Sequence, residues 1–155
     1  MSSWQAPDGL EPVLAARLWV LRGDDLTLRS LVKPVVWPTD GPLHATCTAP
    51  LELRADDHEA PSESCYCGFW GLPLPGRLDE VELPQPEGWK VGGVAKLWGR
   101  ILVGTRGWRA EWARPTALIV PNRRRSIPID LLQSVAARYG LILLNEWPTL
   151  TPLAA

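Results

Sequence analysis

Residues 90–120, KVGGVAKLWGRILVGTRGWRAEWARPTALIV, carry the clearest strand pattern in this chain. Short runs within the segment are rich in valine, isoleucine, leucine and tryptophan, which are enriched in β-strands. Glycines at positions 92, 93, 99, 104 and 107 separate or bend these runs. Because glycine suits tight turns and bulges, the segment predicts three or four short strands in a curled antiparallel sheet.

Shorter segments upstream and downstream can add strands to this sheet. ARLWVL (16–21) predicts a strand, and LTLRSLVKPVVW (26–37) predicts an extended segment that its proline interrupts. In LHATCTA (43–49), small and apolar residues occupy every second position, which is the period of a half-buried strand. LILL (141–144) can return the chain to the sheet.

One helix is predicted near the C-terminus, over about residues 127–139. Pro128 suits a first helical turn, and Asp130 places a negative charge near the positive end of the helix dipole. Gly140 is the expected stop. The apolar residues form one stripe at helical spacing: Leu131, Leu132, Val135, Ala136 and Tyr139. The whole pattern predicts an α+β fold with a mainly antiparallel, small barrel-like sheet and one C-terminal helix.

Length and composition are those of one folded domain over residues 1–155, with loose ends at 1–12 and 148–155. The hydrophobic fraction of 46% excludes disorder throughout. Nine tryptophans and 16 prolines are unusual, and such proline density favours short strands and ordered loops over long helices. The tryptophans can build a core or line a recognition surface.

Charge is divided unevenly along the chain. Residues 1–87 carry a net charge of −8 and residues 88–138 carry +8. This asymmetry indicates either a negatively charged partner or pairing between the two halves within the fold.

The three cysteines and one histidine form a cluster with metal-ligand chemistry. Cys47, His58, Cys65 and Cys67 lie within 21 residues, and three sulfurs with one nitrogen are a common donor set for closed tetrahedral zinc sites. In extended backbone, Cys65 and Cys67 point the same way, so both sulfurs can reach one ion. Gly68 would let the backbone turn close to it. The spacing predicts a structural Zn²⁺ that clips this loop to the fold.

Other roles for these residues remain open. Cys47 can be a small core residue on its strand, and His58 can be an exposed loop residue among acidic neighbours. A redox role for the Cys65–Cys67 pair is less favoured because so short a disulfide loop would be strained. A catalytic zinc is less favoured because four protein ligands leave no open coordination position.

Four segments match a recognisable pattern: CTAP (47–50), HEAPSESCYCGFWG (58–71), VGGVAKLWGRILVGTRGWRAEWARPTAL (91–118) and ARYGLILL (137–144). Together they resemble an uncharacterised family of bacterial, actinobacterial-type, tryptophan-rich proteins. The resemblance covers roughly residues 17–144 and implies a shared fold with a Cys/His cluster, but no established activity. Thr105 and Arg106 depart from the family pattern, which more often has an acidic residue or a histidine near this turn.

Tryptophan and arginine alternate in the strand segment. The residues that could contact a partner are Trp98, Arg100, Arg106, Trp108, Arg109 and Trp112. Interleaved tryptophan and arginine can stack bases and neutralise phosphates, or form an anchor for a protein partner. The alternatives are a filled tryptophan core, and an enzyme or small-ligand receptor with an aromatic pocket around Trp98, Trp108, Glu111 and Trp112.

A basic run, Arg123, Arg124 and Arg125, precedes the predicted helix and can form an anion-binding patch. The sequence contains no P-loop, dinucleotide-binding glycine motif, G-x-S-x-G or H-E-x-x-H motif. We therefore predict a non-catalytic binding or adaptor module that engages a protein or a nucleic acid. No segment predicts a targeting signal or a membrane span, so a cytoplasmic location is expected.

Overall fold

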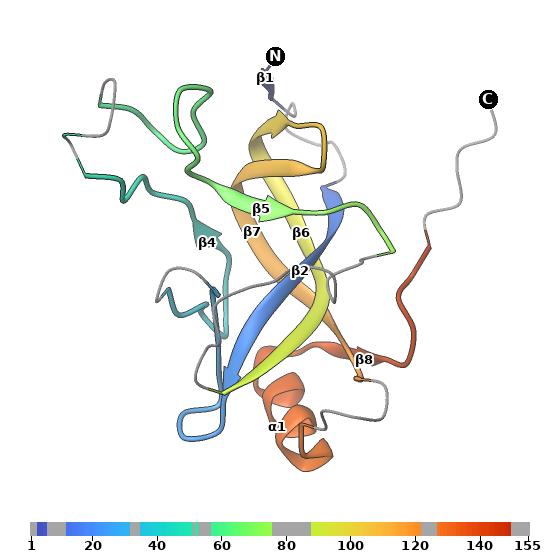
Figure 1. The fold of residues 1–155 in the computed structure, drawn as a ribbon. Helices are drawn as coiled ribbons and strands as arrows, with labels where there is room; N and C mark the ends of the chain where they lie inside the picture. Colours follow the sequence, from blue (N-terminus) through green and yellow to red (C-terminus); the bar gives the residue numbers. More distant parts are fainter. Residues whose placement is uncertain are drawn as a thin grey trace.

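The structure is a computed structural model that describes residues 3–5, 12–31, 35–50, 52, 57–75, 88–121 and 127–149. In this part of the chain, a mostly antiparallel sheet curls into a half-barrel, and a single helix lies at one end of it (Figure 1). The predicted α+β class is therefore confirmed. The basic run at 123–125 and most of the two expected loose ends lie outside the described residues.

Two long strands form the centre of the sheet. β6 (Trp89–Val103) and β7 (Trp108–Ile119) pair antiparallel and are joined by a tight turn in which the Gly104 N–H donates to the Gly107 carbonyl at 2.8 Å. The prediction of three or four short strands here is wrong. The glycines at 92, 93 and 99 lie inside β6 and do not end it, and a bulge beside Gly99 bends the strand instead.

The bend at Gly99 has a clear cause. The register between β6 and β7 shifts between Trp98 and Ile101, and Gly99 has a φ of +80°. A Cβ atom at this position would lie 2.7 Å from a carboxylate oxygen of Glu111. Glycine therefore permits both the positive φ and the close approach of β7, as in other β-bulges.

The remaining strands extend the sheet around this pair. β2 (Val13–Arg22) pairs with β6, and β3 (Thr27–Arg29) pairs with β2. The shorter strands are β1 (Ser3–Gln5) on β6, with β4 (Leu43–His44), β5 (Phe69–Gly71) and the parallel β8 (Ile142–Leu144) on β7. Ser3–Gln5 is therefore paired, although it falls in the segment expected to be loose.

The segment predicted as a strand over 43–49 pairs only at its first two residues. Exposure nevertheless alternates beyond β4, since Ala45 is buried and Cys47 half-buried while Thr46 and Thr48 are exposed. The Ala45 N–H donates to the Glu111 carbonyl at 2.7 Å, which keeps this segment beside β7. Cys47 is thereby directed inward from an extended backbone.

The C-terminal helix, α1 (Ile129–Tyr139), closes one end of the half-barrel beside β8 (Figure 1). Its buried face is Leu132, Val135, Ala136 and Tyr139, as the apolar stripe predicts. Gly140 ends the helix in the left-handed conformation, with a φ of +67°. No helix in the described residues is long and apolar enough to cross a bilayer.

Aromatic side chains build the centre of the core. Trp19 from β2 and Trp37 are almost fully buried, and their rings meet edge to face with centroids 5.5 Å apart. Phe69 also packs on Trp37, with a centroid distance of 5.2 Å. At least two of the nine tryptophans therefore serve the core and not a surface.

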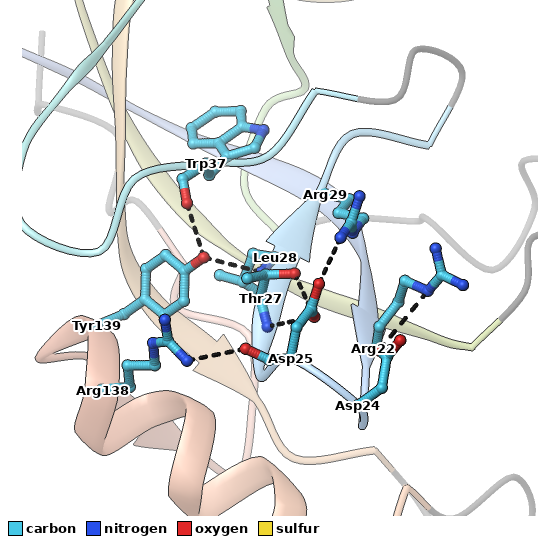
Figure 2. Close-up of polar contacts among 9 residues, drawn as sticks. All are labelled: Arg22, Asp24, Asp25, Thr27, Leu28, Arg29, Trp37, Arg138 and Tyr139. Carbon is cyan, nitrogen blue, oxygen red and sulfur yellow. Dashed lines mark hydrogen bonds and ion pairs between the residues drawn. The ribbon is translucent and has the colours of Figure 1, made fainter.

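A hydrogen-bond network, buried at Tyr139, attaches α1 to this core (Figure 2). The Tyr139 hydroxyl donates to the Trp37 carbonyl at 2.7 Å and accepts from the Leu28 N–H at 2.9 Å. Arg138 donates to the backbone carbonyl of Asp25 at 2.8 Å. The helix, β3 and the segment that carries Trp37 are thus held at fixed positions relative to one another.

Candidate metal centre

Four side chains with metal-ligand chemistry converge at one side of the sheet. The ligand atoms of Cys47, His58, Cys65 and Cys67 all lie within 4.8 Å of one another. Cys67 is buried and the other three are half-buried. These are the four residues that the sequence predicts, and they lie close enough to bind one metal ion.

Two of the separations correspond to edges of a coordination tetrahedron. The Sγ atoms of Cys47 and Cys65 are 3.7 Å apart, and Cys67 Sγ is 3.4 Å from His58 Nε2. A tetrahedral ion with metal–sulfur bonds of about 2.3 Å and a metal–nitrogen bond of about 2.0 Å places such donors roughly 3.5–3.8 Å apart. All three cysteines are free thiols, and 3.7 Å is far longer than a disulfide bond of about 2.05 Å.

The loop that carries three of the donors is tightly packed at its end. Gly68 follows the last cysteine with a φ of +108°, and a Cβ atom there would lie 2.8 Å from Cβ of the buried Pro61. The next residues form β5, which pairs with β7. Glycine at position 68 thus lets the chain pass from the donor loop directly into the sheet.

Arg109 holds the backbone of this loop through hydrogen bonds from its side chain. It lies on β7, is only 8% exposed, and donates through Nη1 to the carbonyl oxygens of Ser62, Cys65 and Cys67, the last at 3.0 Å. Its guanidinium also lies over the Trp70 ring, 5.3 Å from the centroid. Arg100, on β6, donates to the carbonyl of Glu59 at 3.2 Å. Two arginines from the segment predicted to contact a partner therefore hold the backbone of the donor loop.

The electrostatics of the four donors favour one thiolate and oppose a second in the absence of a cation. Burial by itself raises the pKa of Cys65, but hydrogen bonds from the Cys67 N–H, Cys47 and His58 outweigh it and lower this pKa to about 7. Burial raises the pKa of Cys67 to about 11, and the neighbouring sulfurs oppose its ionisation further. Cysteine binds metal as the thiolate. A divalent cation would offset the repulsion between neighbouring thiolates and so favour their ionisation.

The other four predicted contact residues have different surroundings. Trp98 and Trp112 are half-buried and stack on each other, with ring centroids 6.4 Å apart and planes 7° from parallel. Trp108 packs against the core, whereas Arg106 is exposed at the turn between β6 and β7. Trp98 and Trp112 therefore lie together on the sheet, whereas Arg100 and Arg109 donate hydrogen bonds to the donor loop.

Glu111 is also engaged within the fold. It accepts hydrogen bonds from His44 Nε2 at 3.0 Å and from the Arg100 N–H at 3.2 Å. Burial alone would raise the pKa of Glu111, but these two hydrogen bonds outweigh it and lower the pKa below its ordinary value. His44 in turn packs on Trp112, with centroids 4.3 Å apart. The residues of the alternative aromatic pocket are thus largely occupied with one another.

Sequence reasoning did not single out the structural role of Arg109, nor did it single out Arg17. The signal for Arg17 was a cation in the middle of the apolar strand segment ARLWVL, where a charged residue needs a specific reason to be tolerated. For Arg109, no sequence signal distinguishes a buried arginine that binds carbonyls from an exposed one that binds a partner.

A scan against protein-family models found no match for the chain, and neither curated proteins nor solved structures gave one.

Proposed function

We propose that Cys47, His58, Cys65 and Cys67 bind one structural Zn²⁺ and that the protein is a non-catalytic, zinc-stabilised binding module. The observation that carries this proposal is the convergence of three sulfurs and one imidazole nitrogen within 4.8 Å. This donor set suits zinc, and four protein ligands would leave no coordination position for a substrate. A thiolate site of this kind fits a cytoplasmic location, where thiols stay reduced.

Elemental analysis and a single substitution test the zinc site. We expect about one zinc per chain in purified protein, and Cys65→Ser should lose the ion and melt at a lower temperature, since the metal links three separate parts of the chain. Tyr66→Phe is the matched control, because Tyr66 lies between two of the ligands but is 85% exposed. A Cys65→Ser protein with wild-type zinc content, or a metal-free wild-type protein with unchanged stability, would refute the proposal.

The binding surface that we propose for a protein or nucleic-acid partner includes Trp98, Trp112 and Arg106, with the basic run at 123–125 as a further contact. The neighbouring Trp98 and Trp112 support this surface because each is only half-buried, and the part of an indole that stays accessible can contact a base or fill a pocket in a partner. A nucleic acid predicts affinity that falls steeply with salt, whereas an apolar protein anchor predicts weak salt dependence. Gel-shift experiments at two salt concentrations separate the two.

A further inference from the structure

A cleft adjoins the donor loop, and Cys65 and Cys67 are among the residues that line it. The structure contains an open cleft of about 810 Å³ between β2, the segment that follows β4, and residues 64–70. Its lining is mostly apolar, with several hydroxyl groups from serine and threonine. This volume is in the range of sites that bind small organic molecules, roughly 300–1,000 Å³.

Arg17 supplies a positive charge to this cleft. Its guanidinium donates to the Trp70 carbonyl at 2.6 Å and to the Ser30 hydroxyl at 3.4 Å, and Nε is buried without a hydrogen-bond partner. The charged group also lies over the rings of Trp37 and Phe69, 4.9 and 5.7 Å from their centroids.

All of these contacts of Arg17 are with neutral groups. Among the described residues, no carboxylate pairs with Arg17. Burial lowers the pKa of Arg17 to about 10, so the group still carries its charge at neutral pH. Arg17 is half-buried, and a partly desolvated cation without an anion carries a cost that a bound carboxylate would offset.

We propose that the cleft binds a small organic acid whose carboxylate pairs with Arg17 and whose apolar body lies against the cleft walls. A single guanidinium matches a single negative charge, so a monocarboxylate fits better than a doubly charged phosphate. The largely apolar lining would leave a highly polar ligand without partners. The proposal goes beyond the binding module above, because it places a different ligand class at a cleft that Trp98 and Trp112 do not line.

Octanoate, octanol and octylammonium form a matched set of probes, since they differ in the head group and share the apolar tail. Isothermal titration calorimetry on zinc-loaded protein should show octanoate binding about tenfold or more tightly than octanol, because its carboxylate gains a charge-assisted hydrogen bond. Octylammonium should bind more weakly than octanol. No octanoate binding, or equal affinity for acid and alcohol, would overturn the proposal.

Two variants locate the binding. Arg17→Met keeps an apolar side chain of similar length, so octanoate affinity should fall to that of octanol. Thr48→Trp leaves Arg17 intact and fills the cleft from the wall after β4, so affinity for both probes should fall at least tenfold. Arg114→Met, at an exposed position of β7, is the control and should change neither. If Arg17→Met does not fold, the head-group preference of wild-type protein and the Thr48→Trp result decide the matter.

The same samples keep this proposal distinct from the zinc proposal. Zinc-loaded protein that shows no binding of octanoate would refute the carboxylate site alone. Protein that binds octanoate but contains no zinc would refute the metal proposal alone.

Discussion

Arg109 donates a hydrogen bond to the backbone carbonyl of Cys67 at 3.0 Å, which connects the central sheet to a proposed metal ligand through the main chain. The same nitrogen also reaches the carbonyls of Ser62 and Cys65. The shape of the donor loop therefore depends on a side chain that is not itself a ligand, much as outer-shell groups orient the ligands of other metal sites.

Replacing Arg109 with Met should remove this donor from all three carbonyls, of which that of Ser62 also accepts from the Cys65 N–H at 3.2 Å. Because hydrogen bonds to charged groups are worth about 1.5–3 kcal/mol each and are not additive, we expect a loss of about 3–5 kcal/mol in the free energy of unfolding. Zinc occupancy should fall as well. Denaturant titration and elemental analysis measure the two effects. Arg114→Met, exposed on the same strand, should change neither, and equal effects of the two substitutions would contradict the role given to Arg109.

Gly68 and Gly140 allow the steric cost at the donor loop to be separated from the cost of backbone conformation. Both have positive φ, but a Cβ at Gly140 meets no atom within 4 Å, whereas one at Gly68 lies 2.8 Å from Pro61. Gly140→Ala should therefore cost about 1 kcal/mol, and Gly68→Ala about 3 kcal/mol or more. Urea denaturation checks the difference. Equal costs would mean that the loop relaxes freely around a side chain at position 68.

The Tyr139 hydroxyl offers a test of the network that holds α1 (Figure 2). Tyr139→Phe removes the bonds to the Trp37 carbonyl and the Leu28 N–H and leaves both groups buried, so we expect a loss of about 1–3 kcal/mol. Tyr66→Phe is the matched control, because the Tyr66 side chain is 85% exposed. Thermal melting of the two variants should show a lower melting temperature for the first alone.

Local signals in the sequence were sufficient to predict the class of fold, the helix α1 and the four residues of the donor set. The helix was predictable because its apolar stripe and Gly140 act over a few residues. Cys47, His58, Cys65 and Cys67 were predictable because few other roles require three thiols and an imidazole so close together. The length of β6 was not predictable, because an interior glycine such as Gly99 has the same local preference in a bulge as in a turn.

The roles of Arg109 and Arg17 depended on long-range contacts. Arg109 binds residues 42–47 positions earlier in the chain, and Arg17 binds Trp70, 53 positions later. No periodicity or spacing in the sequence encodes such partners. The local sequence around an arginine between two tryptophans on a strand is the same whether the arginine faces solvent or lies beneath a loop.

Asp25 should make the turn between β2 and β3 sensitive to acid. Hydrogen bonds from Thr27, followed by the hydrogen bond and charge of Arg29, lower the pKa of Asp25 in the folded protein. A carboxyl with a depressed folded pKa stabilises the fold above its unfolded pKa, and this contribution is lost as pH falls through the folded value. Asp25→Asn should therefore be less stable than wild type at about pH 7, by roughly 0.5–1 kcal/mol given the screening at a side chain that is 36% exposed.

The stability difference between wild type and Asp25→Asn should begin to shrink as pH falls below about 4, the unfolded pKa, and should be lost only below the depressed folded pKa, where the carboxyl is protonated in both states. Denaturant titrations over a pH series give this difference directly. Asp40→Asn, at an exposed position, is the control and should differ little from wild type at either end of the series. A difference for Asp25→Asn that stays constant with pH would assign the effect to packing and not to charge.

Zinc and the carboxylate cleft should be thermodynamically coupled, because they share residues 64–70 as a common wall. Cys65 and Cys67 line the cleft, and their sulfurs also belong to the candidate metal site. Removal of the ion would leave this wall held by Arg109 and by the pairing of β5 with β7. We expect metal-free protein that keeps its β-sheet circular dichroism to bind octanoate about tenfold more weakly than zinc-loaded protein does. Because the coupling is reciprocal, octanoate should raise the affinity for zinc by the same factor. Calorimetric titration of octanoate into metal-free and zinc-loaded protein measures the coupling. Equal affinities would show that Arg109 and β5 fix the wall without the ion.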